Sequence, residues 1–143
     1  MAAKKGVLID VTRESLHQAT GTTDKMLGSH LLIQAVKASG HGALSRSEQF
    51  EKLRAIVSQL EAVAPTDSLE GMLAVQLVSI HNMAMALLAN ATARTVERGS
   101  AASQASQDLA DLRMGRAMKL IAQFQRGLEA LDRRRGKDRK SVV

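Results

Sequence analysis

Four polar side chains interrupt an otherwise apolar segment and are the residues best suited to chemistry: Gln76, Ser79, His81 and Asn82. A histidine that acts as a general base needs a carboxylate to orient its ring and a reactive partner within reach. The helix positions that would hold such groups, three or four residues from His81, are all apolar: Leu77, Val78, Ala84 and Met85. We therefore expect no catalytic residue and no enzymatic activity. We interpret the set as a hydrogen-bonding layer that fixes helix register, with a solvent-facing His81 as the alternative.

Metal and cofactor chemistry also lack their usual residue patterns. The chain has no cysteine, which removes thiolate nucleophiles and thiolate zinc ligands. No Glu-x-x-His or His-x-x-x-His pair falls on a predicted helix, because the histidines are widely separated: His17, His30, His41 and His81. No glycine-rich phosphate loop follows a predicted strand. We expect no bound metal, no cofactor and no small-molecule substrate.

The strongest electrostatic feature is the basic C-terminal segment. Residues 132–143 carry six basic and two acidic side chains, so most of the formal net charge of +6 lies there. A basic segment can bind nucleic-acid phosphates by counterion release, and such binding is salt-dependent and largely non-specific. The alternatives are a solvated helix end and contact with an anionic membrane or an acidic protein. The side chains predicted to contact nucleic acid are Arg133, Arg134, Arg135, Lys137, Arg139 and Lys140.

Helices must position all of these residues. Alanine, leucine, methionine and charged residues dominate the 143-residue chain, and Pro65 is its single proline. The sequence predicts one all-α domain, a long antiparallel helical hairpin preceded by one or two shorter helices. The predicted segments are a flexible N-terminal arm over 1–23, a helical domain over 24–135 with helices at about 24–38, 46–63, 67–98 and 104–134, and a disordered basic tail over 136–143.

Several helix ends have recognisable capping residues. Ser45 and Glu48 fit a capping box, in which the side chain of each residue accepts a hydrogen bond from the backbone amide of the other. Asp67 is predicted to cap the first long helix, and Glu70 adds a second carboxylate where the helix dipole favours negative charge. Gly99 is expected to end that helix at the hairpin turn.

Both long helices carry apolar stripes at three- and four-residue spacing. In the first, the stripe expected to be buried comprises Leu69, Leu73, Gln76, Ile80, Met83 and Leu87. In the second, the spacing resembles a coiled-coil seam formed by Ala110, Met114, Ala117, Ile121, Phe124, Leu128 and Leu131. The hairpin has more apolar surface than a monomer can bury, so we expect a homo-oligomer or a protein partner. The predicted interface residues are Gln76, Ile80, Met83, Leu87, Met114, Ile121, Phe124 and Leu128.

The segment from Gly71 to Ala93 contains no charged residue and is long enough to cross a bilayer. His81 and Asn82 lie near its centre, and a single span offers no partners for polar groups at that depth. We therefore expect a helix buried by other helices rather than by lipid. The amino terminus has two lysines but no apolar stretch after them, so we expect no secretory leader and a cytoplasmic protein.

One part of the chain resembles a known family. Residues 60–77, His81, Asn82 and Met85, and residues 128–137 together are similar to a family of short, uncharacterised helical proteins from alphaproteobacteria. The resemblance covers about residues 60–137. It implies a bacterial origin and favours treating the two long helices as one unit. It implies no activity and no functional residue.

From these observations we expect a non-enzymatic helical interaction protein that self-associates or binds a partner helix through its Met- and Ala-rich faces. The first alternative is a nucleic-acid-associated factor that uses the basic tail. The second is a membrane-associated helical protein.

Overall fold

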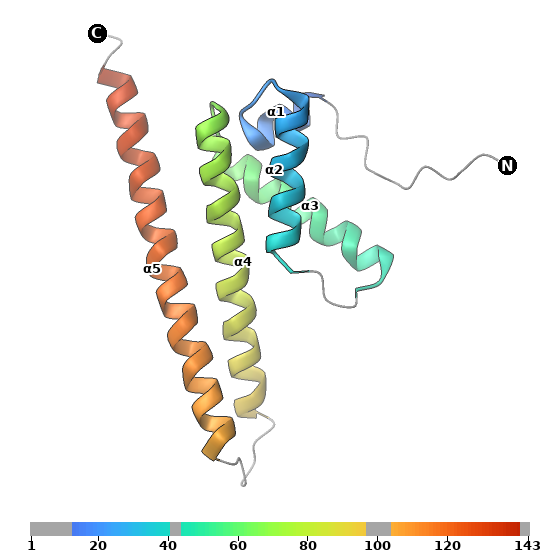
Figure 1. Ribbon diagram of the computed structural model, residues 1–143, viewed down its shortest axis with the longest axis vertical. Helices are drawn as coiled ribbons and strands as arrows, with labels where there is room; N and C mark the ends of the chain where they lie inside the picture. The colour runs from blue at the N-terminus through green and yellow to red at the C-terminus, as the bar shows by residue number, and fades with distance from the viewer. Residues whose placement is uncertain (1–12, 41–43, 97–103, 141–143) are drawn as a thin grey trace, which may run out of the picture.

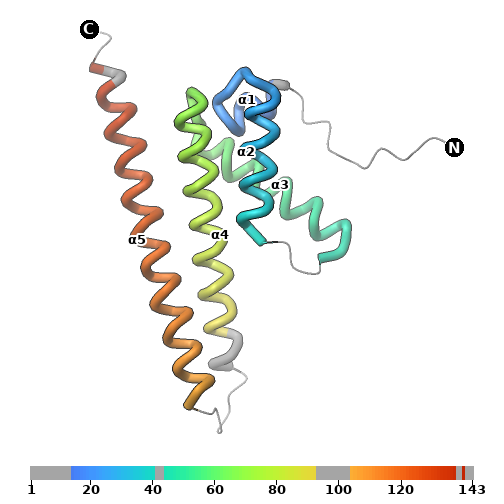
Figure 2. The backbone as a smooth tube through the Cα atoms, viewed as in Figure 1, coloured from blue at the N-terminus to red at the C-terminus, as the bar shows by residue number. Residues whose placement is uncertain are grey.

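The computed structural model describes residues 13–40, 44–96 and 104–140, and these form five helices and no strand (Figure 1). The helices are α1 (Arg13–Thr20), α2 (Lys25–Ala38), α3 (Arg46–Val63), α4 (Ser68–Val96) and α5 (Gln104–Lys140). The long helix α4 lies between α5 on one side and the three shorter helices on the other, as the chain trace in Figure 2 also shows. The prediction of an all-α fold built on a helical hairpin is confirmed.

The described halves of α4 and α5 nearest the predicted turn extend beyond α1, α2 and α3 (Figure 1). There, Figure 1 shows each of the two helices with only the other as a described neighbour. The residues predicted to form the turn, including Gly99, lie outside the described part of the chain. A pair of helices can cover only one side of each, so this half of the hairpin has the least shielded apolar surface.

Hydrogen bonds at the helix ends agree with the predicted caps. The Ser45 hydroxyl accepts from the Glu48 amide at 3.3 Å, and the Glu48 carboxylate accepts from the Ser45 amide at 2.7 Å. This is the predicted capping box. At α4, the carboxylate of Asp67 accepts from the Glu70 amide at 2.9 Å, which confirms Asp67 as the cap.

The prediction of a flexible arm over 1–23 is wrong for its last part, because residues 13–20 form α1. Leu16, Ala19 and Thr20 of this helix are buried. The chain leaves α1 through Gly21, which has a left-handed φ of 68°, and Thr20 lies against Gly71 of α4. Tertiary contacts therefore hold a helix of eight residues, which is too short to be stable alone. Residues 1–12 lie outside the described part.

The prediction of a disordered tail from residue 136 is also wrong where the structure describes it, since α5 continues to Lys140. Gly136 weakens a helix interior by only about 1 kcal/mol, while cations are favourable in the last turns of a helix. The continuous helix keeps the basic side chains at fixed positions on its surface.

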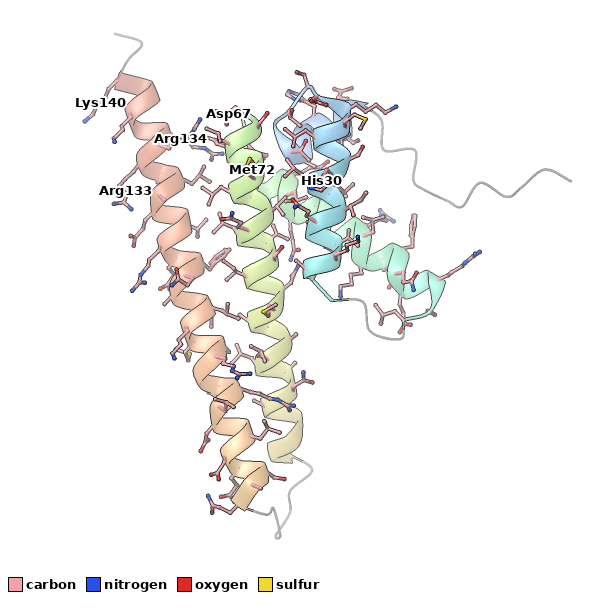
Figure 3. The ribbon with its side chains drawn as sticks, viewed as in Figure 1. His30, Asp67, Met72, Arg133, Arg134 and Lys140 are labelled. Atoms are coloured by element: carbon pink, nitrogen blue, oxygen red, sulfur yellow. The ribbon has the colours of Figure 1, made fainter. Side chains whose placement is uncertain are left out.

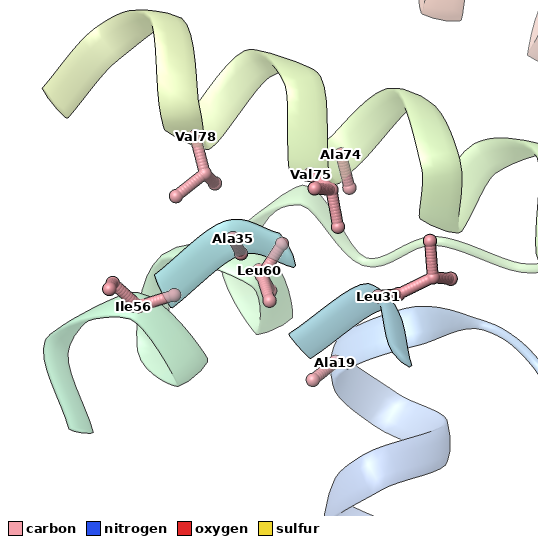
Figure 4. Close-up of a cluster of buried hydrophobic side chains, with 8 residues drawn as sticks. All are labelled: Ala19, Leu31, Ala35, Ile56, Leu60, Ala74, Val75 and Val78. Carbon is pink, nitrogen blue, oxygen red and sulfur yellow. The ribbon is translucent and has the colours of Figure 1, made fainter. Parts of the chain in front are cut away.

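The main core lies where α1, α2 and α3 meet α4 (Figure 4). It is aliphatic and has no aromatic member, in agreement with the composition. Its buried residues are Ala19, Leu31, Ala35, Ile56, Leu60, Ala74, Val75 and Val78.

Small residues form much of the contact between α4 and α5. Ala84 and Ala91 of α4 and Ala110 and Ala117 of α5 are buried. A Cβ atom at Gly127 would lie 2.5 Å from Cδ2 of Leu77. The two helices therefore approach closely along these positions, and Leu77 and Leu131 are larger residues that are also buried.

Candidate functional site

The polar side chains of α4 form a hydrogen-bonded cluster around Asn82. The amides of Asn82 and Gln59 exchange two hydrogen bonds, each 3.0 Å long, and Nδ2 of Asn82 also donates to the Ser39 hydroxyl at 3.0 Å. The cluster joins the C-terminal end of α2 and the C-terminal half of α3 to α4. The predicted polar layer therefore exists at Asn82, and its partners Gln59 and Ser39 come from segments that the sequence pattern did not connect with it.

The other three polar residues do not join this cluster. Ser79 donates back to the Val75 carbonyl at 2.7 Å, and Gln76 is exposed. The His81 ring is exposed and lies 5.6 Å from the Phe124 ring of α5, measured between centroids. The alternative of a solvent-facing His81 is thus the one that the structure supports.

A second polar cluster joins the start of α4 to the end of α5. Nη2 of Arg135 donates to the Glu70 carboxylate at 2.9 Å, and to the carbonyls of Val63 at 2.9 Å and Ala64 at 2.8 Å. Nη2 of Arg134 donates to the Asp67 carboxylate at 2.5 Å (Figure 3). The two ion pairs therefore fasten the C-terminal part of α5 to the junction between α3 and α4.

Glu70 is the centre of this ion-pair cluster, since its side chain is only 1% exposed. Its carboxylate also accepts from the Thr66 amide at 3.0 Å. Nε of Arg134 is buried 3.9 Å from the Glu70 carboxylate and has no hydrogen-bond partner within the described residues. A carboxylate this buried is stable only with such compensation.

Both carboxyl groups of the cluster titrate below their usual range. The hydrogen bond from Arg135 holds the pKa of Glu70 below its ordinary value, although burial acts in the opposite direction. The backbone amide of Glu70 is the main cause of the lowered pKa of Asp67, and Arg134 adds to it. A carboxyl group with a lowered pKa in the folded state stabilises the fold above its unfolded pKa, and this stabilisation disappears as the pH falls through the folded value.

We therefore expect the free energy of unfolding to decrease as the pH falls below the ordinary glutamate value of 4.5. Urea unfolding at pH 7 and pH 3 measures the decrease. The Glu70→Gln variant keeps an acceptor but cannot titrate, so its loss of stability over the same range should be smaller than that of the wild type. An equal loss in both proteins would show that Glu70 does not contribute.

These ion pairs correct the predicted nucleic-acid contacts. Arg134 and Arg135 are half-buried and paired inside the protein, so they are not available to an external phosphate. Arg133 and Lys140 project from the side of α5 away from α4 (Figure 3), and Lys137 is exposed. The side chain of Arg139 lies outside the described part of the structure.

The predicted interface on α4 lies on a face that neither α2 nor α5 covers. We call this row of residues the open face of α4: Leu69, Met72, Gln76, Ile80, Met83 and Leu87. Leu69 is 59% exposed, Met72 45% and Met83 48%. The predicted stripe had Leu73 in place of Met72, and the expectation that it is buried is wrong at Leu69, Gln76 and Met83, which are exposed. Its other members, Leu73, Ile80 and Leu87, are half-buried. The buried positions of α4 are instead Glu70, Gly71, Ala74, Val75, Leu77, Val78, Ala84 and Ala91.

The open face continues into a groove of about 820 Å³ between α2 and α4. Met72, Gln76 and Ile80 line the α4 wall of this groove, and Leu31, Gln34 and Lys37 line the α2 wall. Its surface is therefore mainly apolar and has one basic group, on α2. A neighbouring helix that covered the open face would also contact this groove.

The predicted interface residues of α5 lie at the edge of the α4–α5 seam. Ile121 and Phe124 are half-buried, while Met114 and Leu128 are exposed. Phe124 and Leu128 line a groove of about 370 Å³ together with His81 and residues of α3. The predicted seam is thus confirmed at Ala110, Ala117 and Leu131, which are buried, and is only partly covered elsewhere.

Helix α1 contains a Glu-x-x-His pair, in a segment predicted to be a flexible arm. Glu14 and His17 lie one turn apart, and Nδ1 of His17 is 3.1 Å from the Thr22 carbonyl. A metal site needs further ligands. Within residues 13–40, 44–96 and 104–140, no group of three or more histidine, aspartate or glutamate side chains is placed to hold a metal ion.

One helical segment, Ser68–Thr92, is long and apolar enough to cross a membrane by length and composition. Of its most apolar window, 28% is buried inside the protein. Comparison of the chain with protein-family models, with curated proteins and with solved structures gives no match. The resemblance of residues 60–137 to an alphaproteobacterial family therefore stays a prediction.

Proposed function

We propose that this chain is a non-enzymatic helical interaction protein that self-associates through the open face of α4. The observation that carries the proposal is the open face itself, in which Leu69, Met72 and Met83 are exposed and Ile80 and Leu87 are half-buried. It lies on a helix whose residues 71–93 include no charge. Fully burying one such side chain is worth about 1.5–3 kcal/mol. Covering the row with another helix therefore removes an unfavourable contact with water.

The spacing of the open face supports a second copy of the chain as the partner. The row is nearly symmetric about residue 78, so an antiparallel pair of α4 helices places Leu69 against Leu87 and Met72 against Met83. Gln76 then faces Ile80. Such a two-fold contact uses one surface twice, and it requires no charge complement because the row has no charged residue.

Sedimentation velocity over a range of concentrations tests this proposal. We expect the wild-type chain to form dimers at tens of micromolar. The Met83→Glu variant introduces two carboxylates into each symmetric contact, and we expect it to weaken the dimer at least about tenfold, which corresponds to about 1.4 kcal/mol.

Met26→Glu is the matched control, because Met26 is 83% exposed in the first turn of α2 and lies outside the open face. We expect it to leave the dimer unchanged. A wild-type chain that is monomeric at these concentrations, or an equal effect of the two substitutions, would contradict self-association through this face.

Association with a membrane is the second candidate, and the length and apolar composition of Ser68–Thr92 favour it. The two candidates differ in what covers the open face, which is a second copy of the chain in one case and the lipid of a membrane in the other. A protein that stays dispersed as a dimer without detergent supports self-association. A protein that needs detergent and binds uncharged lipid vesicles through the same face supports the membrane.

A further inference from the structure

A row of basic side chains runs along the face of α5 that points away from α4. Its members are Lys119, Arg126, Arg133, Lys137 and Lys140, and we call them the basic row. Their spacings of seven, seven, four and three residues place them on one side of a helix. All five are exposed. The row spans about 31 Å at 1.5 Å per residue.

The packing of α5 keeps this row in solvent. Ala110, Ala117 and Leu131 of α5 are buried, and α4 is the one described helix against which α5 packs. Figure 3 shows Arg133 and Lys140 on the side of α5 away from α4, while Arg134 points towards Asp67. The ion pairs of Arg134 and Arg135 therefore fix the rotation of α5 and direct the basic row outwards.

Two described acidic side chains lie near the row, Glu129 and Asp132, and Asp132 is exposed directly before Arg133. Glu129 is exposed on the same side of α5, and the Arg133 guanidinium donates to its backbone carbonyl at 3.3 Å. Asp108 and Asp111 belong to the other end of the helix, beyond Lys119. A positive potential thus extends along the C-terminal part of α5 and attracts a polyanion.

The residues between the cations indicate which polyanion fits. Ala122, Ala130 and Gly136 lie among them, so from Arg126 to Lys140 the row offers no large apolar side chain. The exposed Met118 lies beside Lys119, at the start of the row. Helices that bind a membrane surface insert such side chains, and proteins that bind single strands stack bases on aromatic rings. Neither device is present from Arg126 to Lys140. A straight, rigid line of cations matches instead the phosphate backbone of a double helix.

We propose that the basic row of α5 binds the phosphate backbone of duplex DNA without reading its sequence. The surface is separate from the open face of α4, so the proposal does not depend on self-association. It replaces the predicted six-residue tail contact, since it leaves out Arg134, Arg135 and Arg139 and adds Lys119 and Arg126.

Fluorescence anisotropy with a labelled duplex of arbitrary sequence tests the proposal in a salt series. Five phosphate contacts give a slope of log affinity against log salt of about −4.5, so affinity falls about 500-fold between about 50 and 200 mM salt. We expect Arg126→Gln/Arg133→Gln to reduce the slope by about 2. The matched control, Arg46→Gln/Arg54→Gln, removes the same charge from exposed positions of α3 and should leave the slope unchanged.

Three results would overturn the proposal. The first is no binding at low salt, and the second is an equal loss of affinity in the two double variants. The third is binding of the wild type to anionic vesicles but not to the duplex. In the Met83→Glu variant we expect duplex binding to persist with the same slope per chain, which separates this proposal from self-association.

Discussion

Replacement of Gly71 by alanine is expected to lower the free energy of unfolding by about 3 kcal/mol or more, because it forces two helices apart. A Cβ atom at this position would lie 1.9 Å from the carbonyl oxygen of Thr20. The obstacle is backbone, so no side chain can rotate away from it. Either α1 must leave α4 or α4 must bend, and both movements disrupt the core around Ala19. Urea unfolding followed by circular dichroism measures the loss.

Gly115→Ala is the matched control for this experiment. Gly115 lies within α5, and a Cβ atom there would have no neighbour within 4 Å among the described residues. The same substitution should therefore stabilise the protein by about 0.5–1 kcal/mol, through helix propensity alone. If the two variants changed stability in the same direction and by similar amounts, the close contact between α1 and α4 would be wrong.

The elements predicted most accurately from the sequence are those whose ends are determined by neighbouring residues in the chain. Helix α3 has its predicted bounds because Ser45 and Glu48 form a capping box at one end and Pro65 follows the other. Helix α1 could not be predicted in this way. It has eight residues and no regular apolar stripe, and it is held by the contact of Thr20 with Gly71, about fifty residues away in the chain.

The faces of α4 show a second reason why the spacing of apolar residues does not predict the whole structure. This helix is apolar on nearly every side, so a three-and-four spacing can be drawn along several stripes. The larger side chains suggested that the stripe through Ile80 and Met83 is buried. In the structure, small residues such as Ala74 and Ala84 take the buried positions, because they let the neighbouring helices approach closely. The four α4 residues named from the sequence as part of an interface, Gln76, Ile80, Met83 and Leu87, lie on the open face.

The basic segment shows a third feature that the sequence alone did not predict correctly. Consecutive arginines on a helix point in directions about 100° apart, so Arg133, Arg134 and Arg135 cannot act as one patch. The partners of the last two, Asp67 and Glu70, lie in a distant part of the sequence, where the pattern predicts only a cap and a first-turn carboxylate. The seven-residue spacing from Lys119 to Arg126 and Arg133 is visible in the sequence, and it becomes meaningful once α5 is known to continue to Lys140.

Removal of the arginine that compensates Glu70 is the second substitution with a large expected effect. Arg135→Met leaves a carboxylate that is 1% exposed without its main partner, and we expect it to destabilise the fold by about 3–5 kcal/mol. Arg133→Met is the matched control, since Arg133 is exposed two residues earlier on the same helix. It should change stability by less than about 0.5 kcal/mol. Urea unfolding at pH 7 compares the two.

The double variant Glu70→Met/Arg135→Met separates two contributions to stability. One is the net stabilisation by the ion pair, and the other is the destabilisation caused by leaving one buried charge without its partner. With both charges removed, two flexible apolar side chains fill the same space and no charge stays buried. We expect the double variant to be more stable than Arg135→Met by about 2 kcal/mol or more. If instead the two single effects simply add, the groups do not interact. Removing one charge of such an ion pair is strongly destabilising, whereas replacing both charges by apolar side chains changes the stability little. The ion pair then acts mainly by fixing the rotation of α5, and that rotation determines which basic side chains face the solvent.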